Sequence, residues 1–185
     1  MGKRAVIAID IQNEYFPGGK LELVGISEAS DKASRVLDHA RQTGDLVIHV
    51  RHEAQTPDAP VFTPGSDGVK IHSCVQPLND ETVIVKNYPN SFRNTALQDI
   101  LQKEGVTDVV LVGAMSHMCI DATARASADL GYQTTVVHDA CATRDLEFNG
   151  QTVPAAQAHA TLMAALAFAY GKVLSAEEYL GTVRT

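Results

Sequence analysis

Three side chains able to act as an acid, a base or a nucleophile stand at the ends of short apolar runs. Asp10 and Lys86 each follow directly after such a run, and Cys119 lies between another run and an alanine-rich segment. A carboxylate can move protons, a thiol can attack a carbonyl carbon, and an ammonium stabilises both groups as anions. Because open parallel sheets bind ligands beyond the carboxyl ends of their strands, we expect the three side chains to converge at one edge of a sheet.

Cys119 is the candidate nucleophile. In the first turn of a predicted helix its thiol would face the positive end of the helix dipole, and a nearby ammonium would lower its pKa towards the reactive thiolate. The main-chain N–H groups of that turn would stabilise an oxyanion on the attacked carbon. The alternative for Cys119 is a buried, unreactive thiol. For Asp10 the alternative is a loop cap, and for Lys86 it is a side chain that reaches out to solvent.

The other cysteines and histidines point to neither a disulfide nor a metal. The chain has three cysteines and no CxxC spacing, which argues against a disulfide framework and a thiolate zinc site. We interpret Cys74 and Cys141 as packing residues or incidentally exposed ones. No Asp-x-His or His-x-x-x-His element joins His49, His52 and His72, so we predict no metal site.

The elements that must position these residues alternate between strand and helix. Runs of nearly continuous apolar character are typical of parallel strands that are covered on both faces. The sequence therefore predicts an α/β fold, a three-layer α/β/α sandwich with a mainly parallel, six-stranded, Rossmann-like sheet. We expect strands at residues 5–9, 46–50, 82–85, 109–112, 134–137 and 172–174, and helices at residues 27–42, 94–104, 119–130 and 154–170.

Two connections, at residues 15–26 and 53–80, are too long to be simple turns. Long loops in compact domains are often functional, so we expect them to shape a pocket at the carboxyl edge of the sheet. Several side chains follow strand ends or flank the chemical motifs, and for the aromatic ones core packing is the alternative. The expected pocket residues are Gln12, Tyr15, Phe16, Tyr88, Phe92, His117 and Phe148.

Composition and charge restrict the domain count and the partners. The 185 residues fit one domain, residues 1–185, and the net charge of -7 argues against a nucleic-acid partner. The sequence has no signal-peptide pattern and no stretch of transmembrane length, so we expect a cytoplasmic protein with no membrane partner. The predicted helix at residues 154–170 is apolar almost all round, which predicts a homo-oligomer, either a dimer or a tetramer.

The ordered combination of these motifs resembles the isochorismatase-like cysteine hydrolases, the family that includes nicotinamidases, N-carbamoylsarcosine amidohydrolases and isochorismatases. The resemblance runs from the first strand to the last helix. The matching pieces are Asp10-Ile11-Gln12, Lys86 followed by Asn90-Ser91-Phe92, the turn Gly113-Ala114-Met115-Ser116-His117-Met118-Cys119, and Asp139-Ala140-Cys141-Ala142-Thr143.

The resemblance implies a catalytic triad of Asp10, Lys86 and Cys119. It also implies a cis peptide bond between Ala114 and Met115, which would orient an oxyanion-hole amide close to Cys119. Nicotinamidases carry a metal-binding Asp-x-His motif near the second strand, where this chain has Arg-His-Glu at residues 51–53. The departure argues against nicotinamide as the substrate, and we expect no metal and no cofactor.

We hypothesise that Asp10 takes the proton of Cys119 and that the thiolate forms a thioacyl-enzyme with a small amide substrate. The nearest alternative is the isochorismatase-type cleavage of a vinyl ether, in which Asp10 acts as an acid and Cys119 is dispensable. From another class of protein, the chain could be a catalytically silent small-molecule-binding module or a flavodoxin-like receiver. A receiver needs several acidic residues near the end of the first strand, and Glu14 alone matches that pattern poorly.

Overall fold

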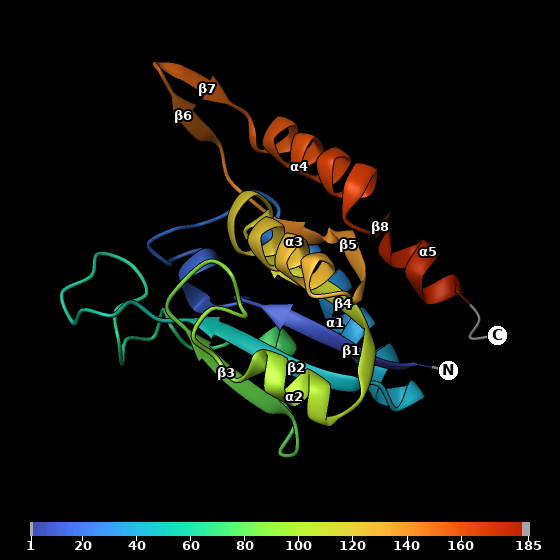
Figure 1. The fold of residues 1–185 in the computed structure, drawn as a ribbon. Helices are drawn as coiled ribbons and strands as arrows, with labels where there is room; N and C mark the ends of the chain where they lie inside the picture. The colour runs from blue at the N-terminus through green and yellow to red at the C-terminus, as the bar shows by residue number, and fades with distance from the viewer. Residues whose placement is uncertain (1, 183–185) are drawn as a thin grey trace.

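The computed structural model describes residues 2–182, and at its centre lies a sheet of six parallel strands (Figure 1). The strands run in the order β3-β2-β1-β4-β5-β8 across the sheet. Their apolar runs alternate between two buried faces, as the near-continuous hydrophobic pattern predicts. The strands are β1 (Lys3–Ile9), β2 (Leu46–His52), β3 (Thr82–Lys86), β4 (Val106–Ala114), β5 (Gln133–Ala142) and β8 (Lys172–Leu174).

Helices cover both faces of the sheet, which confirms the predicted three-layer α/β/α fold. One hydrophobic core lies between the sheet and helices α1 (Ile26–Thr43) and α5 (Ala176–Gly181). The other lies between the sheet and helices α2 (Leu97–Lys103), α3 (Asp121–Asp129) and α4 (Ala155–Ala169). No helix within residues 2–182 combines the length and apolar character needed to cross a bilayer.

The middle of the sheet contains a topological switch point. Strands β1 and β4 are neighbours, and the chain leaves them towards opposite edges of the sheet. In doubly wound folds a crevice opens beyond the carboxyl ends of such a pair, and ligands bind there. The strand order also differs from the 2-1-3-4-5 order of flavodoxin-like receivers, which excludes a receiver of that fold.

Two helix starts differ from the prediction. Helix α2 begins at Leu97 rather than at residue 94, because Asn94 adopts a left-handed backbone conformation with φ of 56°. The segment Ser116–Ile120 forms a π-helical turn before α3 begins at Asp121. Cys119 therefore lies within this π turn and not at the first residue of an α-helix.

Two elements near the carboxyl terminus were absent from the sequence prediction. A hairpin of β6 (Leu146–Phe148) and β7 (Gln151–Val153) projects beyond α4 (Figure 1). Its turn residues, Asn149 and Gly150, both have positive φ angles, as a tight hairpin turn requires. Helix α5 begins with a capping box, in which Ser175 and Glu178 each bond to the other's backbone N–H.

The two long connections are joined by one buried carboxylate. The short 3-10 helix Asn13–Tyr15 leads into the first, and the second contains another, Ser73–Val75. Glu14, in the first of these helices, accepts hydrogen bonds from the backbone N–H groups of Lys20 in the first connection, at 3.0 Å, and Phe62 in the second, at 3.1 Å. The carboxylate thus links the two connections beside the carboxyl edge of the sheet.

Candidate active site

Asp10, Lys86 and Cys119 meet at the carboxyl edge of the sheet. The Lys86 Nζ atom lies 2.7 Å from Asp10 Oδ2 and 3.2 Å from Cys119 Sγ, so the ammonium bridges the carboxylate and the thiol. The side chains of Asp10 and Lys86 are 0% exposed, and Cys119 is 5% exposed. An ammonium that contacts both a carboxylate and a thiol therefore lies in a site that is shielded from solvent.

Strand register explains why these distant residues converge. Ile9 pairs with Val50 of β2 and with Gly113 of β4, so Asp10 emerges between the ends of both neighbours. Gly113 has a φ of 125°, and a Cβ atom there would lie 1.9 Å from the carbonyl oxygen of Ile9. Only glycine allows β1 and β4 to approach this closely. The strand ends therefore meet where the carboxylate and the cysteine turn begin.

The backbone of Asp10 turns sharply at the end of β1. Its φ is 53°, in the left-handed region that non-glycine residues seldom adopt. Its N–H still donates to the carbonyl of Val50 at 2.8 Å, and its own carbonyl accepts from the N–H of Gln12 at 3.0 Å. The strand ladder thus continues up to Asp10 and ends there, which fixes the carboxylate at the edge.

Burial and neighbouring charges together raise the pKa values of both Lys86 and Cys119. Burial tends to lower the pKa of Lys86, but the Asp10 and Cys119 charges outweigh burial and leave this pKa raised. Burial, followed by the Asp10 carboxylate, raises the pKa of Cys119, and the opposing effect of Lys86 is smaller. The expectation of a lowered thiol pKa is therefore wrong, because it counted the helix dipole and the ammonium but not desolvation and the carboxylate. Burial and the carboxylate thus both favour the protonated thiol.

The turn that carries the cysteine is tightly organised. The peptide bond between Ala114 and Met115 is cis. The backbone N–H groups of Met118 and Ile120 both donate to the Met115 carbonyl, at 3.0 and 3.2 Å. Side chains fix the same turn, since Ser116 Oγ lies 2.8 Å from His159 Nδ1.

His52 is a contact of the site that the sequence analysis did not anticipate. Its Nδ1 atom lies 3.1 Å from Lys86 Nζ. From the sequence alone, this histidine is considered only as a metal ligand. The available signal was its place just after the second apolar run, whereas its pairing with Lys86 belongs to the register of β2 and β3 in the folded chain.

Gln12 is a structural clamp and not a free pocket wall. Its amide nitrogen donates to the carbonyls of His52 at 2.8 Å and Val69 at 2.9 Å. Its amide oxygen accepts from the N–H of His52 at 2.7 Å. Since these bonds occupy both ends of the buried amide, Gln12 ties the end of β2 to the following loop.

Three of the aromatic residues expected around the pocket differ in burial and in their contacts. Tyr15 is buried beside the triad, where burial, then Asp10 and Cys119, raise the pKa of its hydroxyl. Phe16 is also buried, and its ring stacks on His72 with centroids 3.6 Å apart. Phe148 is 73% exposed on the projecting hairpin, so it does not line a buried cavity within one chain.

The other expected pocket residues make contacts along the same edge. The guanidinium of Arg93 covers the Tyr88 ring at 3.8 Å. Phe92 stacks on Tyr132 at 6.2 Å and packs against the core on the α2 side. His117 Nδ1 lies 2.6 Å from the Thr143 hydroxyl, which joins the cysteine turn to the end of β5.

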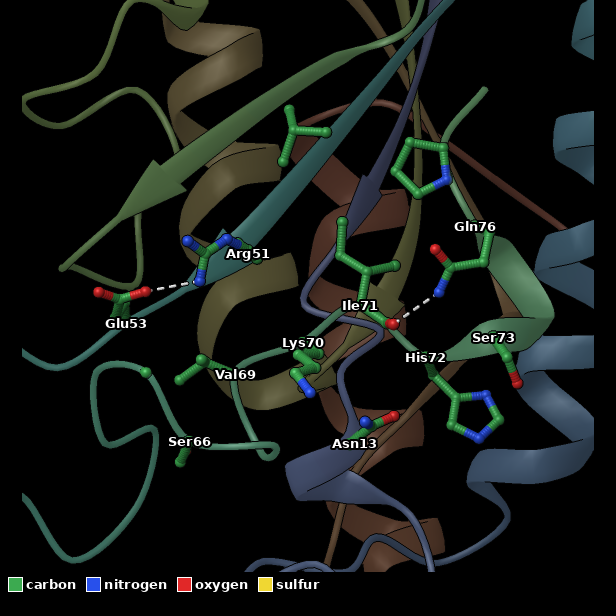
Figure 2. A pocket seen from close by; sticks show the side chains of 13 residues that line it. Asn13, Arg51, Glu53, Ser66, Val69, Lys70, Ile71, His72, Ser73 and Gln76 are labelled. Carbon is green, nitrogen blue, oxygen red and sulfur yellow. Dashed lines mark hydrogen bonds and ion pairs between the residues drawn. The ribbon is translucent and has the colours of Figure 1, made fainter. Parts of the chain in front are cut away.

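A cavity of about 630 Å³ lies on the other face of the sheet (Figure 2). Arg51 and Val83 line it, and they alternate along their strands with His52 and with Ile84, which face the triad side. Figure 2 shows the Arg51 guanidinium directed at Glu53. The Arg51 Nη1 atom donates to Glu53 Oε2 at 2.5 Å. No triad residue lines this cavity.

The remaining thiols and histidines lie elsewhere. Cys141 is buried against the carbonyl of Val137, and burial raises its pKa to about 12. Cys74 Sγ lies 3.0 Å from His72 Nδ1 in the long loop, and burial raises its pKa. Over residues 2–182 no three His, Cys, Asp or Glu side chains are grouped so that they could hold a metal ion.

Comparison with known proteins agrees with this fold. A family model described as the isochorismatase domain matches residues 4–178. An uncharacterised isochorismatase family protein of Bacillus subtilis, YddQ, is 48% identical, over 95% of this chain and 98% of its own length. The crystal structure of a proposed isochorismatase hydrolase from Oleispira antarctica has a TM-score of 0.94 at 51% identity, covering 98% of this chain and 97% of that chain. The chain belongs to the isochorismatase family of hydrolases.

More distant relatives carry names of two kinds. A secreted isochorismatase effector of Verticillium dahliae, Isc1, is 35% identical over 94% of this chain and 88% of its own length. A maleamate amidohydrolase of Pseudomonas putida is 32% identical over 74% of this chain and 71% of its own length. The family therefore includes an amide-cleaving enzyme alongside proteins named for isochorismatase.

Proposed function

We propose that this chain hydrolyses the C–N bond of a small amide through a thioester on Cys119, with Asp10 as the base and acid and Lys86 as the stabilising cation. The observation that carries the proposal is the contact of Lys86 with both Asp10 and Cys119 in one buried site. The amidohydrolase among the relatives supports this reaction class.

The geometry suggests a definite order of proton movements. The thiol proton passes to Asp10 as the sulfur attacks the carbonyl carbon, and the new oxyanion is held by N–H groups of the turn after Ala114. Collapse of this intermediate breaks the C–N bond, and Asp10 gives its proton to the departing nitrogen. Water then attacks the thioester and loses a proton to Asp10, after which the acid leaves and the proton returns to sulfur.

The raised pKa of Cys119 accords with a base that acts during the reaction and not before it. A thiol that stays protonated at rest resists oxidation and alkylation. The ammonium of Lys86, already 3.2 Å from sulfur, would stabilise the thiolate once Asp10 has taken the proton. In this proposal the thiolate forms as Asp10 takes the proton during the attack.

Vinyl-ether hydrolysis is the second candidate. In that reaction Asp10 in its acid form protonates the enol carbon of the substrate, and water adds to the resulting cation and returns a proton to Asp10. The hemiketal then breaks its C–O bond to give a ketone and an alcohol, and no bond to sulfur forms. The protonated thiol and the relatives named for isochorismatase favour this chemistry.

The role of the sulfur separates the two reactions. A library of small amides and vinyl ethers is tested with the wild type, with Cys119→Ala, and with Cys74→Ala as the matched control. Amide hydrolysis through a thioester predicts loss of turnover only in Cys119→Ala, and an acyl adduct on the Cys119 peptide by mass spectrometry. Turnover of an amide by Cys119→Ala at the wild-type rate would contradict the proposal, and vinyl-ether turnover by that variant would favour the alternative.

A further inference from the structure

The Lys86 ammonium has three close polar partners inside the protein: an ion pair with one and a hydrogen bond to each of the other two. An ammonium has three N–H donors and no acceptor. Its three partners are Asp10 Oδ2 at 2.7 Å, Cys119 Sγ at 3.2 Å and His52 Nδ1 at 3.1 Å. Because the lysine side chain is 0% exposed, water does not readily replace a lost partner. Removal of any one acceptor would leave a buried N–H unpaired, which is costly.

His52 is held so that its ring meets this ammonium. His52 and Lys86 are register partners on the parallel strands β2 and β3, so their side chains leave the same face of the sheet side by side. The Gln12 amide grips both the N–H and the carbonyl of His52. The ring also packs edge-on against Phe62, with centroids 5.2 Å apart. Backbone and ring are thus both fixed.

The contact with Lys86 defines the protonation state of the His52 ring. To accept from an ammonium, Nδ1 must be unprotonated, which places the single ring proton on Nε2. Burial, then the charge of Lys86, lower the pKa of His52, and the Asp10 carboxylate opposes them less strongly. The charged groups that face the ring are therefore Lys86 from β3 and Asp10 from the end of β1. The neutral ring acts as an acceptor and not as a second cation.

We propose that His52 is a positioning residue of this site, whose Nδ1 atom accepts a hydrogen bond from Lys86 and keeps the ammonium directed between the carboxylate and the thiol. The consequence for turnover rests on the proposed function. The consequence for the Cys119 thiol does not, because it concerns the resting site alone.

Two substitutions separate the acceptor from the bulk of the side chain. His52→Asn keeps an acceptor, since the amide oxygen is bonded to Cγ as Nδ1 is in histidine. His52→Leu fills similar space without an acceptor, and His52→Ala replaces it if the leucine variant does not fold. His39→Leu on α1, at the opposite face of the sheet, is the matched control. Circular dichroism and urea unfolding establish that each variant is folded.

The first readout is turnover. We expect kcat to fall about 10- to 100-fold in His52→Leu, the equivalent of one charge-assisted hydrogen bond, with little change in KM. His52→Asn should retain kcat within a few fold, and His39→Leu should match the wild type. Wild-type kcat in His52→Leu, or equal loss in the leucine and asparagine variants, would overturn the proposal.

The second readout needs no substrate. Lys86 favours the thiolate of Cys119, so an ammonium that is free to swing away leaves the thiol with a still higher pKa. Iodoacetamide should therefore alkylate the Cys119 peptide several-fold more slowly at a fixed pH in His52→Leu than in His52→Asn or the wild type. Equal rates in all three would overturn the positioning role even if the amide chemistry is correct. If the rates differ as expected while no amide is turned over, the positioning role stands and the proposed reaction fails.

Discussion

The Lys86 ammonium lies 2.7 Å from a carboxylate oxygen of Asp10, and both side chains are withdrawn from solvent. A buried ion pair is stable as a pair, but the loss of one partner leaves an uncompensated charge in a medium of low dielectric constant. The contact therefore matters to stability as well as to the proposed chemistry. Paired substitutions can separate these two contributions.

Asp10→Asn and Lys86→Met should each destabilise the protein by about 3–5 kcal/mol, and the double variant should lose less than the sum of the two. All three should lack hydrolytic activity, because the base or the stabilising cation is missing. Urea unfolding followed by circular dichroism measures the free energies. Strict additivity of the two losses would contradict a direct pair, and full activity in Asp10→Asn would exclude the carboxylate as base.

The reactivity of the Cys119 thiol gives a second prediction. Because burial and the Asp10 carboxylate raise the pKa of this thiol, its alkylation by iodoacetamide at neutral pH should be slow. Replacing Asp10 by Asn removes the negative charge, lowers the thiol pKa and should speed alkylation at the same pH. Peptide mass spectrometry distinguishes Cys119 from Cys74 and Cys141. A slower reaction in Asp10→Asn than in the wild type would show that the carboxylate does not oppose the thiolate.

The sequence allowed the fold and the three central side chains to be predicted, but not all of their environment. Apolar runs revealed the strands of the sheet, and their last residues located Asp10 and Lys86. The pairing of His52 with Lys86 depends on the register of β2 and β3, which a single sequence does not reveal. The thiol pKa was misjudged because burial and the distance to the carboxylate belong to the folded chain.

Short sequence motifs indicated some local structures correctly and others wrongly. The Asn-Gly turn of the β6–β7 hairpin was visible in the sequence, but strands of three residues carry too little alternation to be recognised. The Ser175 to Glu178 spacing is a capping-box signature that was also present. Gln12 was assigned to the pocket from its place after β1, whereas its hydrogen bonds show that it clamps the backbone of His52.

A third prediction concerns acid stability. Burial acts to raise the pKa of Glu81, but hydrogen bonds from Arg41, the Leu78 N–H and His49 outweigh it and lower this pKa from 4.5 to about 2. A depressed folded-state pKa adds stability above the unfolded-state value, and this stability is lost as the pH falls through the folded-state value. The contribution of Glu81 should therefore be complete above pH 4.5 and disappear as the pH approaches about 2.

Glu81→Gln tests this pH dependence. The variant should be less stable than the wild type at neutral pH, and the difference in unfolding free energy should shrink as the pH is lowered from 4.5 towards 2. Urea unfolding at a series of pH values measures it. Glu177→Gln, on the exposed surface of α5, serves as the control and should show little difference at any pH. A pH-independent difference for Glu81→Gln would mean that the carboxylate acts through packing alone.

The last prediction is that the chain associates with copies of itself through the outer side of α4. This helix buries only part of its apolar surface against the sheet, since Phe168 is 92% exposed and Ala160 and Ala164 are also exposed. Exposed apolar surface of this kind on a helix is typical of an interface. In sedimentation at micromolar concentration we expect the wild type to have a mass two or four times that of one chain.

A charge placed on this surface should disrupt the association without unfolding the chain. Phe168→Asp together with Ala164→Asp introduces two like charges at exposed positions, so the circular dichroism spectrum should remain that of the wild type. The double variant should sediment as a monomer, because the free energy cost of burying unpaired charges in an interface exceeds the stabilisation from the apolar contact. Glu177→Arg on α5 should leave the association unchanged. A wild type that is monomeric at this concentration, or a double variant of unchanged mass, would rule out α4 as the interface.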